Sequence, residues 1–146
     1  MSAQKIAVGA DHAGFELKDS LAEHLRGRGF EVLDLGTNSP ESVDYPDFGA
    51  AVGNAVASGE ADLGVCVCGS GIGICMAADK VRGVRAGTVH DETSARLARQ
   101  HNDANVICLG SRLTGPEVAR AALDAWLDAD FEGGRHSRRT GKLDEM

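Results

Sequence analysis

The sequence predicts an α/β protein with a three-layer, doubly wound, Rossmann-like fold around a five-stranded parallel sheet. Short β-rich runs alternate with amphipathic helical patterns along the chain, which is typical of a parallel sheet covered by helices on both faces. The run DLGVCVC at 62–68 is continuously apolar, as expected for a strand buried on both faces. Polar and reactive residues follow most of the runs, at the strand ends where such sheets bind ligands.

The individual elements follow from periodicity and from turn residues. Leu17, Leu21 and Leu25 recur at every fourth position and predict a helix that ends near Gly27 or Gly29. The stretch TNSPESVDYP is predicted to be a loop because of its Pro, Asn and Ser content. The predicted strands are 4–10, 31–36, 62–68, 83–89 and 105–110. The other predicted helices are 47–58, a helix from the GSGIG loop to about Lys80, 91–100, and 115–129 with Val118, Ala122 and Trp126 as its buried stripe.

Composition narrows the class of protein. The chain has 146 residues, 42% of them hydrophobic and 25% charged, which fits one ordinary globular domain over 1–146. A net charge of -7 argues against a nucleic-acid partner, because phosphate binding depends on clustered Lys and Arg. No signal-peptide core and no apolar run of membrane-spanning length is present, and the four cysteines lack the spacing of a disulfide framework. We therefore expect a reduced, cytoplasmic protein without a membrane partner.

The C-terminal residues 130–146 differ from the rest of the chain. They are too polar for a core element, and they carry the basic run Arg135, His136, Arg138 and Arg139 inside an acidic protein. One interpretation is a solvated basic tail. The other is a pair of arginines for bidentate recognition of a phosphate, on a tail that crosses to a partner subunit.

The loop Gly69-Ser70-Gly71-Ile72-Gly73 joins a predicted strand to a predicted helix. Alternating glycines let backbone N–H groups approach an anion, and the helix N-terminus adds partial positive charge; the alternative is a flexible turn. A dinucleotide fingerprint needs glycine at position 74 after the first strand, and a cysteine-dependent phosphatase needs arginine there. Ile74 excludes both.

Cys68 ends the third predicted strand and directly precedes this loop. Free cysteines are usually packed in the core, and we assign that role to Cys66, Cys75 and Cys108. A cysteine beside a helix N-terminus can instead act as a thiolate base. A metal site at Cys66 and Cys68 is disfavoured, because a second ligand pair at zinc spacing is missing. We expect no metal.

Asp11, His12 and His101 can each have a structural or a functional role. Asp11 and His12 follow the first strand, where Asp11 either caps a helix or binds sugar hydroxyls while His12 contacts a ring oxygen or a phosphate. His101 lies at a predicted helix end, where it either complements the helix dipole or shuttles protons near neutral pH.

The chain resembles the type B ribose-5-phosphate isomerases and their galactose-6-phosphate isomerase relatives almost from end to end. The resemblance is carried by KIAVGADHAGFELK, VDYPDFG, CVCGSGIGICMAADK, RQHNDANVICLGSR and WLDADFEGGRH, in this order. It implies a Rossmann-like sheet without a nucleotide, and a homodimer, often paired into a tetramer, whose active sites are each built from two chains.

The resemblance also implies roles for individual residues. Cys68 corresponds to the base that moves a proton between C1 and C2, and His101 to the residue that assists opening of the furanose ring. The residues matching the sugar-holding positions are Asp11, His12, Tyr45, Ser70 and Asn102, and those around the phosphate are Arg112, Arg135 and Arg139. A branch of the family uses a glutamate at the position of Ile74, which leaves Cys68 as the base here.

The expected reaction is an aldose–ketose isomerisation of a phosphorylated sugar without a cofactor. His101, with Asp11 opposite, opens the ring, and the Cys68 thiolate moves the proton. The N–H groups of the loop from Gly69 to Gly73, including that of Ile72, and the Ser70 hydroxyl stabilise the enediolate. Ribose 5-phosphate is the expected substrate in the pentose phosphate pathway, with erythrulose, allose and galactose phosphates, or a non-catalytic sugar-phosphate sensor, as alternatives.

Overall fold

Five parallel strands form one sheet in the order β2-β1-β3-β5-β4. The computed structural model describes residues 4–146. The strands are β1 Lys5–Ala10, β2 Glu31–Asp34, β3 Leu63–Cys68, β4 Ala86–Thr88 and β5 Val106–Gly110. Every residue of β3 and β5 is buried, as expected for central strands covered on both faces. The predicted doubly wound, five-stranded parallel sheet is confirmed.

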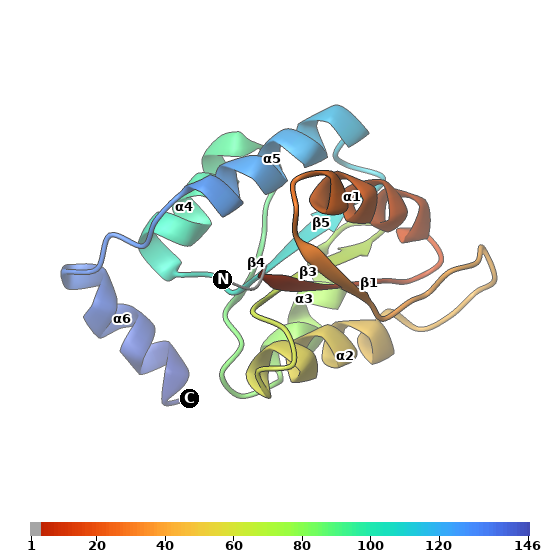
Figure 1. The fold of residues 1–146 in the computed structure, drawn as a ribbon. Coiled ribbons are helices and arrows are strands. Elements are labelled where there is room, and N and C mark those ends of the chain that lie inside the picture. Colours follow the sequence, from red (N-terminus) through yellow and green to blue (C-terminus); the bar gives the residue numbers. More distant parts are fainter. Residues whose placement is uncertain (1–3) are drawn as a thin grey trace.

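Helices cover both faces of this sheet and make three layers (Figure 1). One face carries α1 Phe15–Gly27, α4 Glu92–Asn102 and α5 Pro116–Asp128, and the other carries α2 Tyr45–Ala57 and α3 Ile72–Asp79. The predicted stripe Leu17, Leu21 and Leu25 is buried in the larger of the two apolar clusters. Trp126 of α5 is buried in the same cluster, and its indole N–H donates to the carbonyl of Ala104 at 2.9 Å.

The strand order reverses between β1 and β3, two neighbouring strands inside the sheet. From β1 the chain first moves to β2 and then returns past β1 to β3. Beyond the carboxyl ends of β1 and β3, the connections leave in opposite directions and open a crevice. Asp11 follows β1 and Cys68 ends β3, so the fold places both residues at this crevice.

Three details differ from the sequence prediction. Helix α2 begins at Tyr45, inside the predicted loop, because Pro46 at the first turn has the backbone angle that a helix start needs. Strand β4 is only Ala86–Thr88, at the sheet edge. The stripe proposed for α5 is wrong at one position: Val118 is 46% exposed, and Ala119 faces the core instead.

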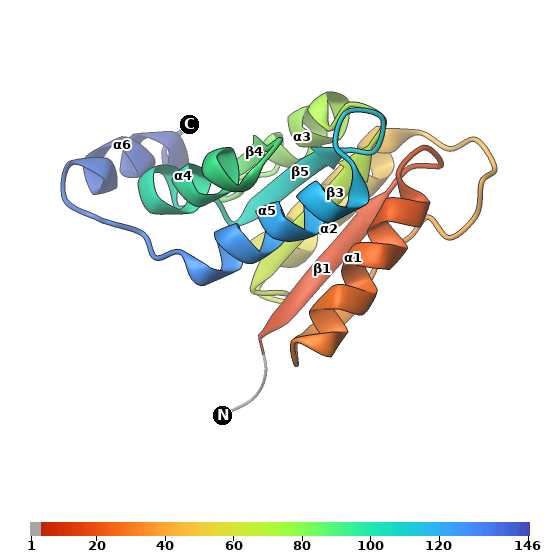
Figure 2. The ribbon, with the colours of Figure 1, turned by 90° about the horizontal axis from the view of Figure 1, so that it is seen from above.

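The C-terminal segment contains a helix that the sequence analysis did not predict. Helix α6, Arg135–Asp144, follows an extended linker and lies beyond α4, away from β1 (Figure 2). Its residues are polar except for Gly141 and the exposed Leu143, but His136 and Thr140 are buried. Among the described residues, no helix is both long enough and apolar enough to cross a membrane.

Candidate active site

Cys68 lies at the end of β3. The loop that follows it, Gly69 to Gly73, is called the glycine loop below. The Cys68 sulfur accepts a hydrogen bond from the backbone N–H of Gly71 at 3.2 Å. Gly71 precedes α3 with φ +76°, a left-handed conformation that favours glycine, and a Cβ there would come within 2.8 Å of the Leu109 backbone. The loop therefore turns back over the end of the sheet and directs an N–H at the sulfur, which stabilises negative charge there.

The glycine loop is fixed from neighbouring strands. Thr88 of β4 donates its hydroxyl to the carbonyl of Gly71 at 2.7 Å. The backbone N–H of Arg112, just after β5, donates to the carbonyl of Gly69 at 3.0 Å. Ser70 Oγ accepts the N–H of Ile72 at 3.2 Å. These bonds hold the loop in one shape before any ligand arrives, which is what an anion site requires.

Asp11 does not cap α1, because the N-cap of that helix is Gly14 and no side chain caps it. Its Oδ1 accepts the N–H groups of Ala13 and Gly14 at 3.0 and 3.1 Å, and so shapes the turn into α1. Its carboxyl group nevertheless borders the same cavity as Cys68. Ser111 fastens this turn to the end of β5 by donating its hydroxyl to the carbonyl of Ala13 at 2.7 Å.

A cavity of about 550 Å³ lies over Cys68 and the glycine loop. Its lining residues are Asp11, Tyr45, Cys68, Gly69, Ser70, Ile72, Gly73, Met76, Arg112 and Leu113. Gly73 lies against the Tyr45 ring so closely that a Cβ would come within 2.5 Å of it. Tyr45, Ile72, Met76 and Leu113 are large apolar residues that remain exposed around the opening. The cavity thus has a reactive floor and an apolar rim.

His12 is oriented by the loop after β2. Its Nδ1 accepts the backbone N–H of Val43 at 3.2 Å. An accepting Nδ1 carries no proton, so the proton of the neutral ring is on Nε2. The same loop is tied down at Asn38, whose side-chain oxygen accepts from the buried Lys18 ammonium at 2.7 Å. His12 is thereby held as an Nε2–H donor.

His101 lies at the other end of the sheet from Cys68. It is in the last turn of α4, and the chain then enters the first residue of β5, Val106. Cys68 pairs with Gly110, the last residue of β5. Val106 and Gly110 are four residues apart, which is about 13 Å along a strand. One chain therefore does not bring His101 to Cys68.

The predicted phosphate ligands are divided in the same way. Arg112 lines the cavity over Cys68, and its guanidinium is near Gly69. Arg135 and Arg139 are exposed on α6, one helical turn apart and on one face. They share the end of the molecule that holds His101, not the end that holds Cys68.

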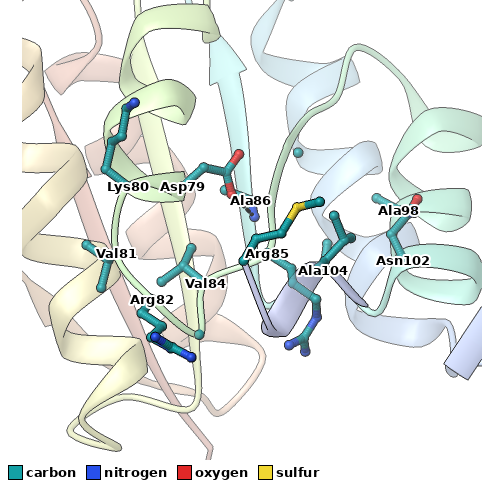
Figure 3. A pocket seen from close by; sticks show the side chains of 14 residues that line it. Asp79, Lys80, Val81, Arg82, Val84, Arg85, Ala86, Ala98, Asn102 and Ala104 are labelled. Atoms are coloured by element: carbon teal, nitrogen blue, oxygen red, sulfur yellow. Dashed lines mark hydrogen bonds between the residues drawn. The ribbon is translucent and has the colours of Figure 1, made fainter. Parts of the chain in front are cut away.

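Asn102 borders a different cavity, of about 450 Å³, between the 79–87 segment, α4 and the end of α6 (Figure 3). Two of the charged residues around it, Arg85 and Asp79, have partners within the fold. Arg85 binds Asp144 at 2.9 Å and Asp103 at 3.6 Å, and Asp79 accepts the N–H of Ala86 at 2.8 Å. Burial raises the pKa of the Asp79 carboxyl above its ordinary value. These groups stabilise the fold here rather than forming a reactive centre.

Around His101 the structure assembles a group that sequence reasoning missed. The rings of His101 and His136 are stacked, with centroids 4.4 Å apart and planes 10° apart. Glu132 Oε1 lies 3.9 Å from His101 Nε2 and 3.6 Å from His136 Nε2. Two histidines and a glutamate are a possible metal-ligand set. In stacked rings, however, the nitrogen lone pairs point in parallel directions, so both rings could not bind one ion without turning.

A family model described as Ribose/Galactose Isomerase matches residues 6–143. The chain belongs to the ribose/galactose isomerase family. It is 52% identical over 136 residues to ribose-5-phosphate isomerase B of Escherichia coli K12, covering 93% of this chain and 91% of that protein.

Solved structures of this family agree with the fold. Ribose-5-phosphate isomerase B of Clostridium thermocellum is 51% identical, with a TM-score of 0.96 and coverage of 97% of this chain and 96% of that one. The enzyme of Mycoplasma genitalium with bound ribulose 5-phosphate is 44% identical, with a TM-score of 0.94 and coverage of 99% and 97%. The family resemblance found in the motifs is confirmed.

Proposed function

We propose that this chain is an aldose–ketose isomerase that interconverts ribose 5-phosphate and ribulose 5-phosphate. The observation that carries the proposal is the Cys68 sulfur at the floor of a cavity, within 3.2 Å of the Gly71 N–H and beside the glycine loop. Membership of the ribose/galactose isomerase family supports it, as does the identity of 52% to an enzyme named for this substrate.

The chemistry follows from the groups at the cavity floor. The Cys68 thiolate removes the C2 proton of the open-chain aldose, and the electron pair moves toward the C1 carbonyl to give an enediolate. The proton then returns to C1, O1 gains a proton and O2 loses one, so that the ketose forms without net redox change. The N–H groups of Gly69 and Ser70 have no acceptor in the described part of the chain, and they are suited to stabilise the enediolate oxygen.

Binding at the nonreacting end of the sugar orients the reacting end. We assign Asp11, His12 and Tyr45 to the sugar, because Asp11 and Tyr45 line the cavity and His12, the residue after Asp11, is held as an Nε2–H donor. The residues of the loop, Gly69, Ser70, Gly71, Ile72 and Gly73, contact the reacting end of the sugar. Arg112 contributes the phosphate contact from this chain.

The active site is proposed to be shared by two chains of a homodimer, or of a tetramer built from such dimers. Three observations support this arrangement. His101 lies at the opposite end of the sheet from Cys68. Arg135 and Arg139 are exposed on a helix that lies away from β1 (Figure 2). The rim of the Cys68 cavity carries exposed Met76 and Leu113, and an exposed apolar rim is typical of a surface that a partner covers.

In this arrangement the partner's tail completes the site. The partner's His101 assists ring opening, opposite Asp11, and the partner's Asn102 holds the sugar. The partner's Arg135 and Arg139 bind the phosphate as charge-assisted donors one helical turn apart. The residues 130–146 thus act across the interface, as part of the one domain that spans 1–146.

We place the enzyme in the cytoplasm, as a step of the pentose phosphate pathway. All four cysteines are free and buried, and a catalytic thiol needs a reducing compartment to remain reduced. No metal and no organic cofactor enters the proposed steps.

The test is direct: the purified protein is incubated with ribose 5-phosphate and ketose formation is followed by absorbance. We expect turnover, and no ketose would contradict the proposal. The family's description also covers galactose isomerases, so kcat/KM should be compared across four-, five- and six-carbon sugar phosphates. A preference for erythrulose, allose or galactose phosphate would reassign the substrate, and tight binding without turnover would identify a sugar-phosphate sensor.

A further inference from the structure

The stacked His101–His136 pair is not explained by the roles assigned so far. His101 ends α4, and its side chain is 39% exposed. His136 is in the first turn of α6 and is 8% exposed. Helix α6 has only two buried residues, His136 and Thr140. One of these two, His136, is buried against the ring of His101.

Glu132 ties the pair to the end of α4. Its backbone N–H donates to the carbonyl of Gln100 at 3.0 Å, the residue before His101. Its carboxylate lies near the Nε2 atoms of both rings. The linker before α6 is thus anchored to the turn that carries His101, and the ring of His101 is bounded by a flat surface and by a negative charge.

His136 is suited to remain uncharged in this position. Burial lowers the pKa of its imidazole, and the neighbouring charges of His101, Arg135 and Arg139 lower it further, against the opposing effect of Glu132. A neutral ring can lie against His101 in either protonation state without strong charge repulsion.

We propose that His136 and Glu132 are positioning residues that hold the His101 imidazole in the orientation required to open the sugar ring. This inference rests on the proposed isomerase function and on the role of His101 in it. Ring opening requires an acid and a base aligned with the ring oxygen and the anomeric hydroxyl, and a misplacement of about 1 Å can cost about 100-fold in rate. His136 supplies the flat face, and Glu132 restricts rotation of the ring.

The contribution of His136 is predicted to come from the shape of its ring. His136→Ala removes the stacked ring, and we expect kcat for ribose 5-phosphate to fall by about 10-fold to 100-fold, with little change in KM. His136→Phe keeps a flat ring in the same place and should retain most of kcat. Glu132→Gln should lower kcat less than His136→Ala does. Arg138→Ala, an exposed change on the same helix, is the matched control and should behave as wild type.

A second readout separates positioning from a general structural effect. Ribulose 5-phosphate has no furanose ring, so uptake of deuterium from D2O at its C1 depends on Cys68 but not on ring opening. His136→Ala should therefore keep the exchange rate of wild type while losing conversion of ribose 5-phosphate.

Four outcomes would overturn the positioning role. The first is an unchanged kcat in His136→Ala, and the second is a loss of kcat in His136→Phe equal to that in His136→Ala. The third is a loss of deuterium exchange in His136→Ala in proportion to its loss of kcat. The fourth is a rise in KM in His136→Ala that accounts for its whole loss of kcat/KM, which would indicate displaced arginines. A wild-type protein that forms no ribulose 5-phosphate would instead contradict the proposed function, so the two failures are distinguishable.

Discussion

The sulfur of Cys68 and the backbone N–H of Gly71 are 3.2 Å apart, in a hydrogen bond that links the end of β3 to the start of α3. Cys66, two residues earlier on the same strand, is fully buried among core side chains. Both cysteines belong to the same apolar cluster, but only Cys68 also borders a cavity. This difference in position makes the two cysteines a matched pair for experiment.

Cys68→Ala should fold normally and lose isomerisation by about 100-fold to 10,000-fold in kcat, the usual contribution of a general base. Cys66→Ala should keep most of kcat, although it should lower the free energy of unfolding by about 1–2 kcal/mol because it leaves a small void in the core. Iodoacetamide should inactivate the wild type, and substrate should protect it. A kcat near that of wild type in Cys68→Ala would refute the proposed base.

Arg135→Ala and Arg139→Ala should each raise KM for ribose 5-phosphate by about 10-fold to 100-fold, because each removes a charge-assisted contact of about 1.5–3 kcal/mol. Arg138→Ala carries the same loss of charge on the same helix and should change KM little. Unphosphorylated ribose should be a poor substrate that the changes barely affect. Equal losses for both sugars would indicate that α6 has a structural role instead.

Much of the fold, and the common location of Asp11 and Cys68, could be predicted from residue pattern. Asp11 and Cys68 were predicted at the ends of strands, and the structure places both at one crevice. Periodicity found α1 but shifted the stripe of α5, because Val118 and Ala119 are adjacent apolar residues and only packing decides which one faces the core.

Helix α6 was missed because its sequence RHSRRTGKLD has no apolar stripe. Its two buried positions are polar, and the contact of His136 with His101 depends on tertiary structure. In the sequence, the spacing of four residues between Glu132 and His136 was the one local indication that these side chains could meet. The cavity rim at Met76 and Leu113 was also missed, since exposure of apolar residues is decided by neighbours distant in sequence.

Removal of metal should leave the activity unchanged. Among residues 4–146, the group that comes nearest to a metal site is His101, Glu132 and His136, and its two rings are stacked instead of converging on a common point. Dialysis against EDTA, followed by assay and by metal analysis, checks this expectation. An activity that the chelator abolishes and one divalent ion restores would contradict the metal-free mechanism.

The titration of His136 should report its environment. Its pKa is lowered by burial and then by the charge of His101, so its Cε1–H resonance should titrate below the ordinary value of about 6.5. A lowered pKa means that protonation costs folding free energy, so His136 lowers stability as the pH falls below about 6.5. His101→Gln should raise the pKa of His136. No change in this variant would mean that the charge of His101 does not lower the pKa of His136.

The shared active site is the central claim, and complementation tests it most directly. Cys68→Ala and His101→Ala should each be nearly inactive as homodimers. Unfolding and refolding an equimolar mixture gives about half heterodimers by random pairing. Each heterodimer has one doubly damaged site and one intact site, so about a quarter of wild-type activity should return. A mixture that stays inactive, although heterodimers are shown to form by mass spectrometry, would mean that each site is built within one chain.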